Sequence, residues 1–291
     1  MIISFITALL NRTTSWRHGW QSICSSGVPT IIRTMSCNKT IAGAIEWSPL
    51  HPCEPMSFSL GSYALMILNV PIQVPASVVC KLWEGAVIRS TVDGGTDRWL
   101  KFLQDSNATV TKPFPEIVSG DFDSIKPETL ASCRNNGCDV VETLDQDYTD
   151  FEKGLRAMIT RCKSPVESVL VISECTGRID QTYSNINTLR LGAELPGNPS
   201  LFILTSDSIT WHLRRGKHII HVPQHLRDKQ QWCAILPFEP KENHITSTGL
   251  KWDLTSHCIK FGGLISSSNT YGDSETVTVD TDAEIIWSMG L

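Results

Sequence analysis

The sequence predicts an α/β fold, in which an N-terminal, mainly parallel α/β sandwich domain is followed by an all-β sandwich domain. Between residues 63 and 190, short apolar runs alternate with segments of helical periodicity, which is typical of a parallel sheet with crossover helices. After a turn-rich stretch at 191–199 the helical periodicity fades, and short alternating or aromatic-rich segments follow, as in antiparallel sandwiches. We therefore expect an α/β catalytic domain at 58–197 and a β-sandwich domain at 198–291.

The first segment, residues 1–57, is predicted to be a poorly ordered extension. Its first 55 residues carry more basic than acidic side chains and many Ser and Thr residues, a composition typical of organellar transit peptides. Two alternatives are a short signal-peptide core in MIISFITALL, which lacks a preceding basic residue, and a natural start at Met56. We expect a cytoplasmic protein, with a weak organellar targeting signal as the alternative, and leave this segment out of the fold argument.

The predicted elements follow in chain order. Strands are expected at apolar runs that end in polar or Gly-rich turns, at 63–68, 87–92, 116–120, 139–143 and 168–173. One helix is expected after Thr149, because Phe151, Leu155 and Met158 fall on one helical face and Thr149 with Glu152 forms a capping-box pattern. A second is expected after Gly177, with Ile179, Tyr183 and Ile186 as its apolar edge. Beyond residue 199 we expect strands at 209–213, 218–222, 232–236, 250–254, 258–261, 276–280 and 285–289.

The bulk composition excludes several classes of protein. The 291 residues are 41% hydrophobic and 19% charged, which suffices for a buried core, and the net charge of −5 with no basic stripe argues against nucleic-acid binding. No apolar run approaches the roughly 20 residues that span a bilayer, so no membrane partner is expected. The ten cysteines include no CxxC pair, which favours reduced thiols in a reducing compartment.

Carboxylates directly follow the predicted strands. They are Asp93, Asp121, Asp123 and the group at 145–150. Ligands of open parallel sheets bind beyond the carboxyl ends of the strands, and carboxylates gathered there repel one another unless a cation lies among them. The sharper hypothesis is a Mg²⁺–nucleotide site. The alternative is that each aspartate serves only a turn or a helix N-terminus.

Two cationic side chains strengthen the phosphate hypothesis. Lys153 lies one helical turn after Asp150, and Arg178 stands beside Gly177 just before a helix, where backbone N–H groups favour anions. The alternatives are an ordinary ion pair between Lys153 and Asp150, and a solvated loop position for Arg178. Neither a P-loop motif nor a dinucleotide-binding motif is present.

Six successive segments resemble the signatures of eukaryotic thiamine pyrophosphokinases, in the order of that family. They are DGGTDR (93–98), GDFDSIKPE (120–128), DQDYTDFEKGL (145–155), GRIDQTYSNINTL (177–189), STGLKWDL (247–254) and LISSSNTY (264–271). The resemblance implies transfer of a pyrophosphoryl group from ATP to the hydroxyethyl oxygen of thiamine, giving thiamine diphosphate and AMP. It also implies Mg²⁺ as cofactor, ATP as co-substrate, and a homodimer with active sites at the subunit interface.

The resemblance also implies roles for individual residues. A catalytic acidic and cationic group would comprise Asp93, Asp121, Asp123, Asp150, Lys153 and Arg178, with Mg²⁺ held by Asp121, Asp123 and Asp150. Substrate contacts would come from Gln146, Thr149, Asp180, Gln181, Trp252, Ser266, Ser268 and Asn269. Asp93 and Asp147 are both candidates for the base that accepts the hydroxyl proton. Without the family resemblance, the sequence would favour a core position for Trp252 and a polar turn for SSSNTY.

Two departures from the family pattern bear on activity. Glu174 and Cys175 stand where the family usually has a Gly-Gly stretch, which is expected to alter the approach of a phosphate before Gly177. Asp97 replaces an amide, and is expected either to weaken triphosphate affinity or to add a metal contact. Two rival functions are a thiamine diphosphate sensor with a degenerate site, and a same-fold Mg²⁺–nucleotide enzyme that acts on another alcohol.

Overall fold

The computed structural model describes residues 37–175 and 177–291, which belong to one compact unit. Its helices are α1 (Ala76–Gly85), α2 (Gly95–Asp105), α3 (Pro127–Asn135), α4 (Asp150–Arg161), α5 (Ile179–Thr188) and α6 (Gln224–Asp228), with a 3₁₀ helix η1 at Leu189–Ala193. The strands are β1 (Asn38–Ile41), β2 (Ala44–Trp47), β3 (Tyr63–Ile67), β4 (Ile88–Val92), β5 (Ile117–Gly120), β6 (Asp139–Glu142), β7 (Ser168–Ile172), β8 (Ser200–Leu204), β9 (Ser208–Leu213), β10 (Gly216–His221), β11 (Trp232–Pro237), β12 (Asn243–Thr248), β13 (His257–Ile259), β14 (Ser266–Thr270), β15 (Thr276–Thr281) and β16 (Ile285–Gly290).

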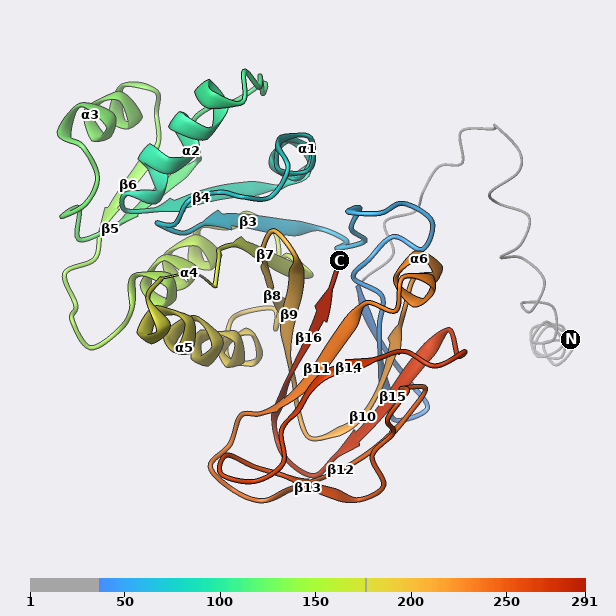
Figure 1. Ribbon diagram of the computed structural model, residues 1–291. Helices are drawn as coiled ribbons and strands as arrows, with labels where there is room; N and C mark the ends of the chain where they lie inside the picture. Colours follow the sequence, from blue (N-terminus) through green and yellow to red (C-terminus); the bar gives the residue numbers. More distant parts are fainter. Residues whose placement is uncertain (1–36, 176) are drawn as a thin grey trace, which may run out of the picture. The chain divides into compact units, whose positions relative to one another are not determined.

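A ten-stranded sheet organises the molecule (Figure 1). Its order is β14-β11-β16-β9-β8-β7-β3-β4-β5-β6. The strands from β8 to β6 along this order are parallel to their neighbours, whereas β8 meets β9 antiparallel and the remaining pairs are antiparallel. The predicted parallel α/β part followed by a β-rich part is therefore confirmed. All five strands predicted between 63 and 173 are present.

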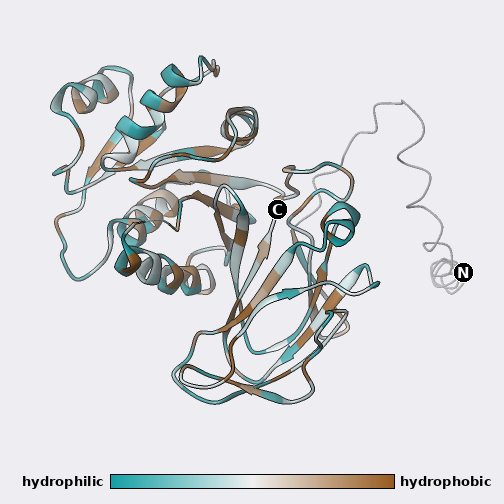
Figure 2. Ribbon diagram, viewed as in Figure 1, coloured by the Kyte–Doolittle hydropathy of each residue, from teal (hydrophilic) through white to brown (hydrophobic). Residues whose placement is uncertain are grey.

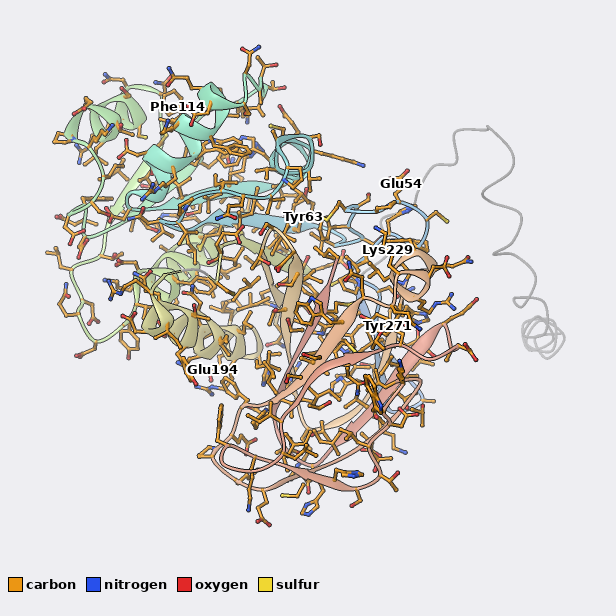
Figure 3. All side chains as sticks on the ribbon, viewed as in Figure 1. Glu54, Tyr63, Phe114, Glu194, Lys229 and Tyr271 are labelled. Atoms are coloured by element: carbon orange, nitrogen blue, oxygen red, sulfur yellow. The ribbon has the colours of Figure 1, made fainter. Side chains whose placement is uncertain are left out.

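Helices cover both faces of the parallel part, as Figure 1 shows for α1 and α2 on one side and α4 and α5 on the other. Strand β3 is buried from both sides: Leu65 packs in the same core as Trp83 of α1, while Met66 packs in the core of α4. A strand that is buried on both faces has an unbroken run of apolar residues in its sequence. Figure 2 shows brown on these strands and teal on much of α2 and α3. The Tyr63 hydroxyl, labelled in Figure 3, donates to the carbonyl of Leu82 across 2.7 Å.

Helix α4 begins where the capping pattern predicts. The Thr149 side chain accepts a hydrogen bond of 3.2 Å from the backbone N–H of Glu152. Phe151, Leu155 and Met158 are buried against the sheet, and this confirms the predicted apolar face. The helix is thus fixed at its start by a cap and along its length by packing, so Asp150 in its first turn has a defined position.

The second sheet, with the order β1-β2-β10-β15-β12-β13, packs on the antiparallel half of the first and completes a sandwich. Strands β1 and β2 come from residues that we expected to be poorly ordered. That prediction is wrong for residues 38–47, because β2 pairs parallel to β10 and Trp47 is buried against Phe202 and Trp211. Composition misled because short strands held by long-range pairing leave little local signal. Residues 1–36 lie outside the described residues.

Several details of the β-rich half differ from the sequence prediction, which also lacks strand β12. Residues 250–254 form a turn between β12 and β13 rather than a strand, while Ser266–Thr270, which reads as a polar turn, is strand β14. Strand β8 lies beyond the predicted boundary at 197/198, yet it is parallel to β7. The parallel sheet therefore extends to Leu204. In the described part of the chain, no helix is both long and apolar enough to cross a membrane.

Candidate active site

Three predicted carboxylates meet at the carboxyl ends of β4 and β5. Asp93 follows β4, and Asp121 and Asp123 follow β5, so that one carboxylate oxygen of each lies within 4.8 Å of the others. Phe122, between the two aspartates, has a left-handed backbone with φ of 63°, and its side chain packs with Val118 and Ile125. Such a conformation is uncommon for a bulky residue and marks a turn held by its surroundings.

Asp93 fixes this turn through hydrogen bonds. Its carboxylate accepts from the backbone N–H of Ser124 at 3.4 Å, from that of Ile125 at 3.2 Å, and from the Ser124 hydroxyl. Gly120 permits the close approach, because its φ is +152° and a Cβ there would lie 2.8 Å from the Cβ of Asp93. Asp93 is only 4% exposed, so it anchors the turn as well as belonging to the acidic group.

Repulsion within the group alters the titration of Asp123. The neighbouring Asp121 carboxylate, followed by Asp93, raises the pKa of Asp123 above its usual range, and Asp150 adds to the effect. The side chain is exposed, and the crowding of negative charge is the main cause of the raised pKa, with a smaller contribution from desolvation. A cation among these oxygens would relieve the repulsion. Mg²⁺ fits the donors, because it prefers carboxylate oxygens and retains water ligands.

Asp150 stands apart from the three-residue group and pairs with Lys153, 3.0 Å away. The Lys153 ammonium also donates to the carbonyls of Thr143 at 2.9 Å and Asp145 at 2.8 Å. An ammonium has three N–H donors, and two of them make these hydrogen bonds beside the ion pair with Asp150. Lys153 therefore ties the loop between β6 and α4 to the first turn of α4. A phosphate contact by Lys153 would have to replace one of these bonds.

The remaining predicted residues of this loop face solvent. Gln146 is exposed, and its amide donates to the Leu144 carbonyl at 3.3 Å. The backbone N–H of Asp147 donates to Asp145 at 2.8 Å in a local turn. The Thr149 hydroxyl is engaged as the cap of α4. The substrate contacts of Gln146 and Thr149, and the role of Asp147 as a base, stay predictions.

Arg178 and Asp180 lie at the start of α5 and bind each other. The guanidinium Nε donates to Asp180 at 2.8 Å and Nη2 makes a second bond to the same carboxylate. This pairing lowers the pKa of Asp180 to about 2. Gln181 follows in the exposed first turn of the helix. Both partners are exposed, so the pair can open to a ligand at little cost.

A second group of predicted residues lies in the β-rich half. Asn269 is 4% exposed and brackets Trp252: it accepts from the Trp252 backbone N–H at 3.3 Å and donates to its carbonyl at 2.9 Å. The Trp252 ring is 57% exposed, with the Lys251 ammonium 4.9 Å from its centroid. An exposed ring on a backbone that Asn269 holds in place argues against a core position for this tryptophan. Ser266 and Ser268 belong to β14 beside Asn269.

We call Asp93, Asp121 and Asp123 the carboxylate group, and Trp252, Ser266, Ser268 and Asn269 the Trp252 group. No hydrogen bond or ion pair among the described residues links these two groups. The predicted residues thus lie in separate sets: the three carboxylates after β4 and β5, the loop and first turn of α4, the Arg178–Asp180 pair at the start of α5, and the Trp252 group in the β-rich half. A site that uses both the carboxylate group and the Trp252 group could therefore combine residues from two chains.

Asp97 does not join the acidic group. Its carboxylate accepts from the backbone N–H of Lys126 at 2.9 Å and from the Thr129 hydroxyl at 2.6 Å. Asp97 is not in the group of potential metal ligands formed by Asp93, Asp121 and Asp123, and both of its oxygens accept hydrogen bonds at the start of α3, so the geometry does not favour the metal contact over the other expectation, weaker triphosphate affinity. A negative charge at a helix N-terminus is favourable, so the departure from the family pattern has a structural reason.

This role predicts a stability loss. We expect Asp97→Ala to lower the free energy of unfolding by about 1 kcal/mol, the usual effect of losing a helix-capping acceptor, and Asp97→Asn to lose less. Urea denaturation measures both, with Asp105→Ala on the exposed side of α2 as control. Unchanged stability in Asp97→Ala, together with weaker ATP use, would instead favour a direct role in triphosphate binding.

Glu174 follows β7 and is 7% exposed. It accepts from the Ser206 backbone N–H at 3.0 Å and hydroxyl at 3.1 Å, while burial raises its pKa. The side chain thus ties β7 to the turn between β8 and β9. Thr176 lies outside the described residues, so the expected change in phosphate approach before Gly177 stays a prediction.

Sequence reasoning missed two residues of the site, Asn69 and Ser124. The Ser124 hydroxyl, besides bonding Asp93, accepts from the Asn69 amide at 2.8 Å and lies 3.3 Å from the Gly94 N–H. Asn69 follows β3 as Asp93 follows β4, so the strand-end rule that selected the aspartates would also have found it.

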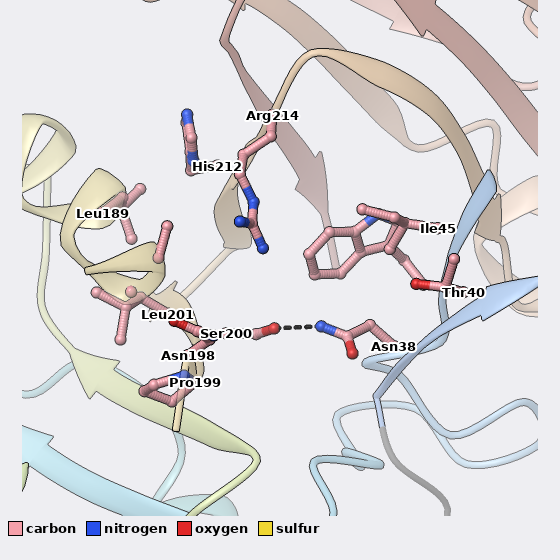
Figure 4. A pocket seen from close by; sticks show the side chains of 13 residues that line it. Asn38, Thr40, Ile45, Leu189, Asn198, Pro199, Ser200, Leu201, His212 and Arg214 are labelled. Carbon is pink, nitrogen blue, oxygen red and sulfur yellow. Dashed lines mark hydrogen bonds between the residues drawn. The ribbon is translucent and has the colours of Figure 1, made fainter. Parts of the chain in front are cut away.

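The cavity drawn in Figure 4 is a different feature. It measures about 140 Å³ and is bounded by β1, β2, η1, β8 and β9, with Arg214 pointing toward Ser200. None of the predicted site residues lines it. The candidate active site is instead the open surface at the strand ends.

The fold and the site define an α/β protein with a carboxylate group at its parallel strand ends, continued by a β-sandwich. The family model described as "Thiamin pyrophosphokinase, catalytic domain" matches residues 79–194. The family model described as "Thiamin pyrophosphokinase, vitamin B1 binding domain" matches residues 217–286. The chain belongs to the thiamin pyrophosphokinase family.

Individual relatives agree with this assignment. Thiamine pyrophosphokinase 3 of Oryza sativa is 31% identical over 79% of this chain and 87% of its own length, and thiamine pyrophosphokinase 1 of the same plant is 30% identical over 89% and 98%. Among solved structures, yeast thiamin pyrophosphokinase superposes with a TM-score of 0.70 at 21% identity, covering 86% of this chain and 92% of that one. At that identity the structural likeness supports the fold.

Proposed function

We propose that this protein is a thiamine diphosphokinase, which transfers a pyrophosphoryl group from ATP to the hydroxyethyl oxygen of thiamine and releases AMP. The observation that carries the proposal is the match to both family domains in order, together with about 30% identity to thiamine pyrophosphokinases over most of the chain. The carboxylate group and the exposed Trp252 supply a polar and an aromatic surface that suit the two substrates.

One assay tests the proposal. The full chain is incubated with ATP, MgCl₂ and thiamine, and AMP and thiamine diphosphate are quantified by chromatography. Equal amounts of the two products are expected. AMP without thiamine diphosphate would point to another acceptor, and thiamine diphosphate binding without turnover would point to a sensor.

In the proposed reaction the thiamine hydroxyl oxygen bonds to the β-phosphorus of ATP, and the bond from that phosphorus to the AMP oxygen breaks. The protein's part is alignment and charge neutralisation. The hydroxyl proton needs an acceptor. Asp93 already accepts three hydrogen bonds, whereas among the described residues none is donated to the Asp147 carboxylate, which favours Asp147 as the base.

We propose that Asp121 and Asp123 hold Mg²⁺, with Asp150 completing the set. The close approach of the Asp121 and Asp123 oxygens and the raised pKa of Asp123, to which Asp150 contributes, support this assignment. When bound, the ion would neutralise phosphate charge. Arg178 is the more accessible candidate for a direct cationic contact with phosphate, because its pair with Asp180 is exposed, whereas the Lys153 side chain is only 9% exposed.

Trp252 is proposed to stack on a ring of thiamine. We expect Trp252→Ala to raise the KM for thiamine about 10- to 100-fold, with a much smaller change in the KM for ATP, since stacking of a base on an aromatic ring contributes about 1–3 kcal/mol. Steady-state kinetics measure both constants. Trp232→Phe, at another partly exposed tryptophan, serves as control. Equal changes in the two KM values would contradict the proposed role.

We also propose that the active protein is a homodimer. The edge of α5 that the sequence predicts as apolar is largely uncovered in the single chain, with Ile179 72% and Tyr183 61% exposed. Leu144 and Tyr148, in the loop that Lys153 ties down, are exposed as well. A second copy would cover these side chains and could bring its Trp252 group to the carboxylate group. Light scattering at micromolar concentration should give twice the chain mass, whereas a monomer that is fully active would contradict the proposal.

A cytoplasmic location stays a prediction. Cys37, Cys133 and Cys233 are buried free thiols, which suits a reducing compartment. Fractionation of cells that express the full chain tests it.

A further inference from the structure

A second cluster of metal-binding side chains lies on the solvent face of the β12–β13 hairpin. Among the described residues, Glu242, His244 and Cys258 each place one potential ligand atom within 4.8 Å of the others. This cluster offers a carboxylate oxygen, an imidazole nitrogen and a thiol sulfur. It is chemically unlike the carboxylate group after β4 and β5, which offers oxygen alone.

Strand register explains how the cluster forms. His244 on β12 is directly opposite Cys258 on β13, and the burial of β12 alternates so that His244 faces solvent while Asn243 and Ile245 face inward. Glu242 is two residues before His244 and therefore points to the same side. Side chains that are opposite each other in an antiparallel pair have Cβ atoms about 4.5–5.5 Å apart, a spacing that one ion can bridge.

Asp282, on the other flank of β12, orients the imidazole. Its carboxylate accepts from the His244 backbone N–H at 2.9 Å and lies 3.3 Å from His244 Nδ1. A carboxylate on one ring nitrogen fixes the ring and makes the other nitrogen a better ligand, an arrangement found around metal-binding histidines. Asp282 lies outside the three-residue cluster, so this contact supports the cluster as a metal site independently of the spacing of its ligand atoms.

One side chain competes with a metal ion. The Lys260 ammonium lies 2.6 Å from Glu242 Oε1, opposite it across the hairpin. Both side chains are substantially exposed, and exposed ion pairs contribute little, so a divalent ion can displace the ammonium or use the second carboxylate oxygen.

We propose that Glu242, His244 and Cys258 form a binding site for a divalent transition-metal ion of the Zn²⁺ class, with Asp282 as the positioning residue. Thiolate and imidazole ligands favour such ions over Mg²⁺. Binding converts the Cys258 thiol to a thiolate and releases its proton. The ion would join β13, the edge strand of its sheet, to β12 at the base of the turn that carries Trp252. This site goes beyond the proposed reaction and does not depend on it.

Cobalt substitution tests the site in the full chain. Titration with Co²⁺ is expected to produce a near-ultraviolet thiolate-to-metal absorption band, which Cys258→Ser abolishes and Cys162→Ser, the control, retains. Competition against a chromogenic chelator should show Zn²⁺ binding at least about 100-fold weaker in His244→Ala but unchanged in His221→Ala. Circular dichroism of each variant establishes that it is folded.

Two further variants separate the site from incidental surface binding. Asp282→Asn is expected to weaken Zn²⁺ affinity about 10- to 100-fold, as loss of an orienting partner does, and Lys260→Met to strengthen it. Zn²⁺ should also slow amide hydrogen exchange across residues 243–260. A Co²⁺ spectrum that Cys258→Ser leaves intact, or equal Zn²⁺ affinity in wild type and folded His244→Ala, would overturn the proposal.

Discussion

Asp123→Asn is expected to lower kcat by about 100-fold or more at saturating Mg²⁺, the size of effect typical of a single electrostatic group at a reacting centre. The variant keeps the shape of the side chain but removes one of the crowded charges beside Asp121 and Asp93. Steady-state production of AMP and thiamine diphosphate measures the loss. Asp105→Asn, on the exposed end of α2, is the matched control. Wild-type turnover in Asp123→Asn would show that Asp123 is not a metal ligand.

The same variant separates a metal role from general damage. The pKa of Asp123 is raised in the folded state, so the folded protein holds this proton more tightly than the unfolded chain. The protonated Asp123 side chain therefore contributes to the stability of the fold at low pH. This contribution is lost as the pH rises from the ordinary pKa of 3.8 through the raised pKa of the folded state. At neutral pH without Mg²⁺, Asp123→Asn should therefore melt at a higher temperature than wild type. Added Mg²⁺ should raise the Tm of wild type more than that of the variant.

Lys153→Met is expected to reduce both stability and activity. The ammonium is 9% exposed and joins two backbone carbonyls to Asp150, and its removal leaves all three acceptors without this partner. Unsatisfied groups of this kind cost about 1–3 kcal/mol, so the free energy of unfolding should fall by that order. The loop at 143–150 loses its tether, so kcat should fall about 100-fold as well. Urea denaturation and the product assay measure the two effects.

The kinetics distinguish two roles for Lys153. If it positions the loop, kcat falls together with amide protection at 143–150, while the KM for ATP changes little. If it contacts phosphate directly, the KM for ATP rises and stability is nearly unchanged. Lys101→Met removes an exposed i,i+4 pair with Asp105 and should alter neither property by much. A folded Lys153→Met with wild-type stability and kinetics would exclude both roles.

Local signals explain which parts of the fold could be predicted. Strands β3 to β7 are apolar runs that end in turns, and α4 has both a periodic face and its Thr149 cap, so each is visible in a short window of sequence. Strands β1 and β14 carry mostly polar residues, while β2 and β14 depend on strands β10 and β11, which are distant in the sequence. Period and propensity contain no information on those partners.

The site shows the same limit. The strand-end rule placed Asp93, Asp121 and Asp123 together, because parallel strands present their carboxyl ends at one edge. The rule did not predict that Asp97 accepts a hydrogen bond at the start of α3. Nor did it predict that Lys153 donates hydrogen bonds to carbonyls of the preceding loop. Such contacts depend on where a neighbouring helix or loop passes, which a linear pattern does not specify.

The antiparallel pairing of β8 with β9 makes one sheet run through both halves of the molecule. A hinge between the halves would break backbone hydrogen bonds and the core around Trp211, so the halves should move and melt as a single body. Calorimetry should then show one cooperative transition for the described unit. Opening and closing over substrates would fall to surface loops, such as those carrying Asp147 and Trp252, and the sheet would serve as a rigid frame between them.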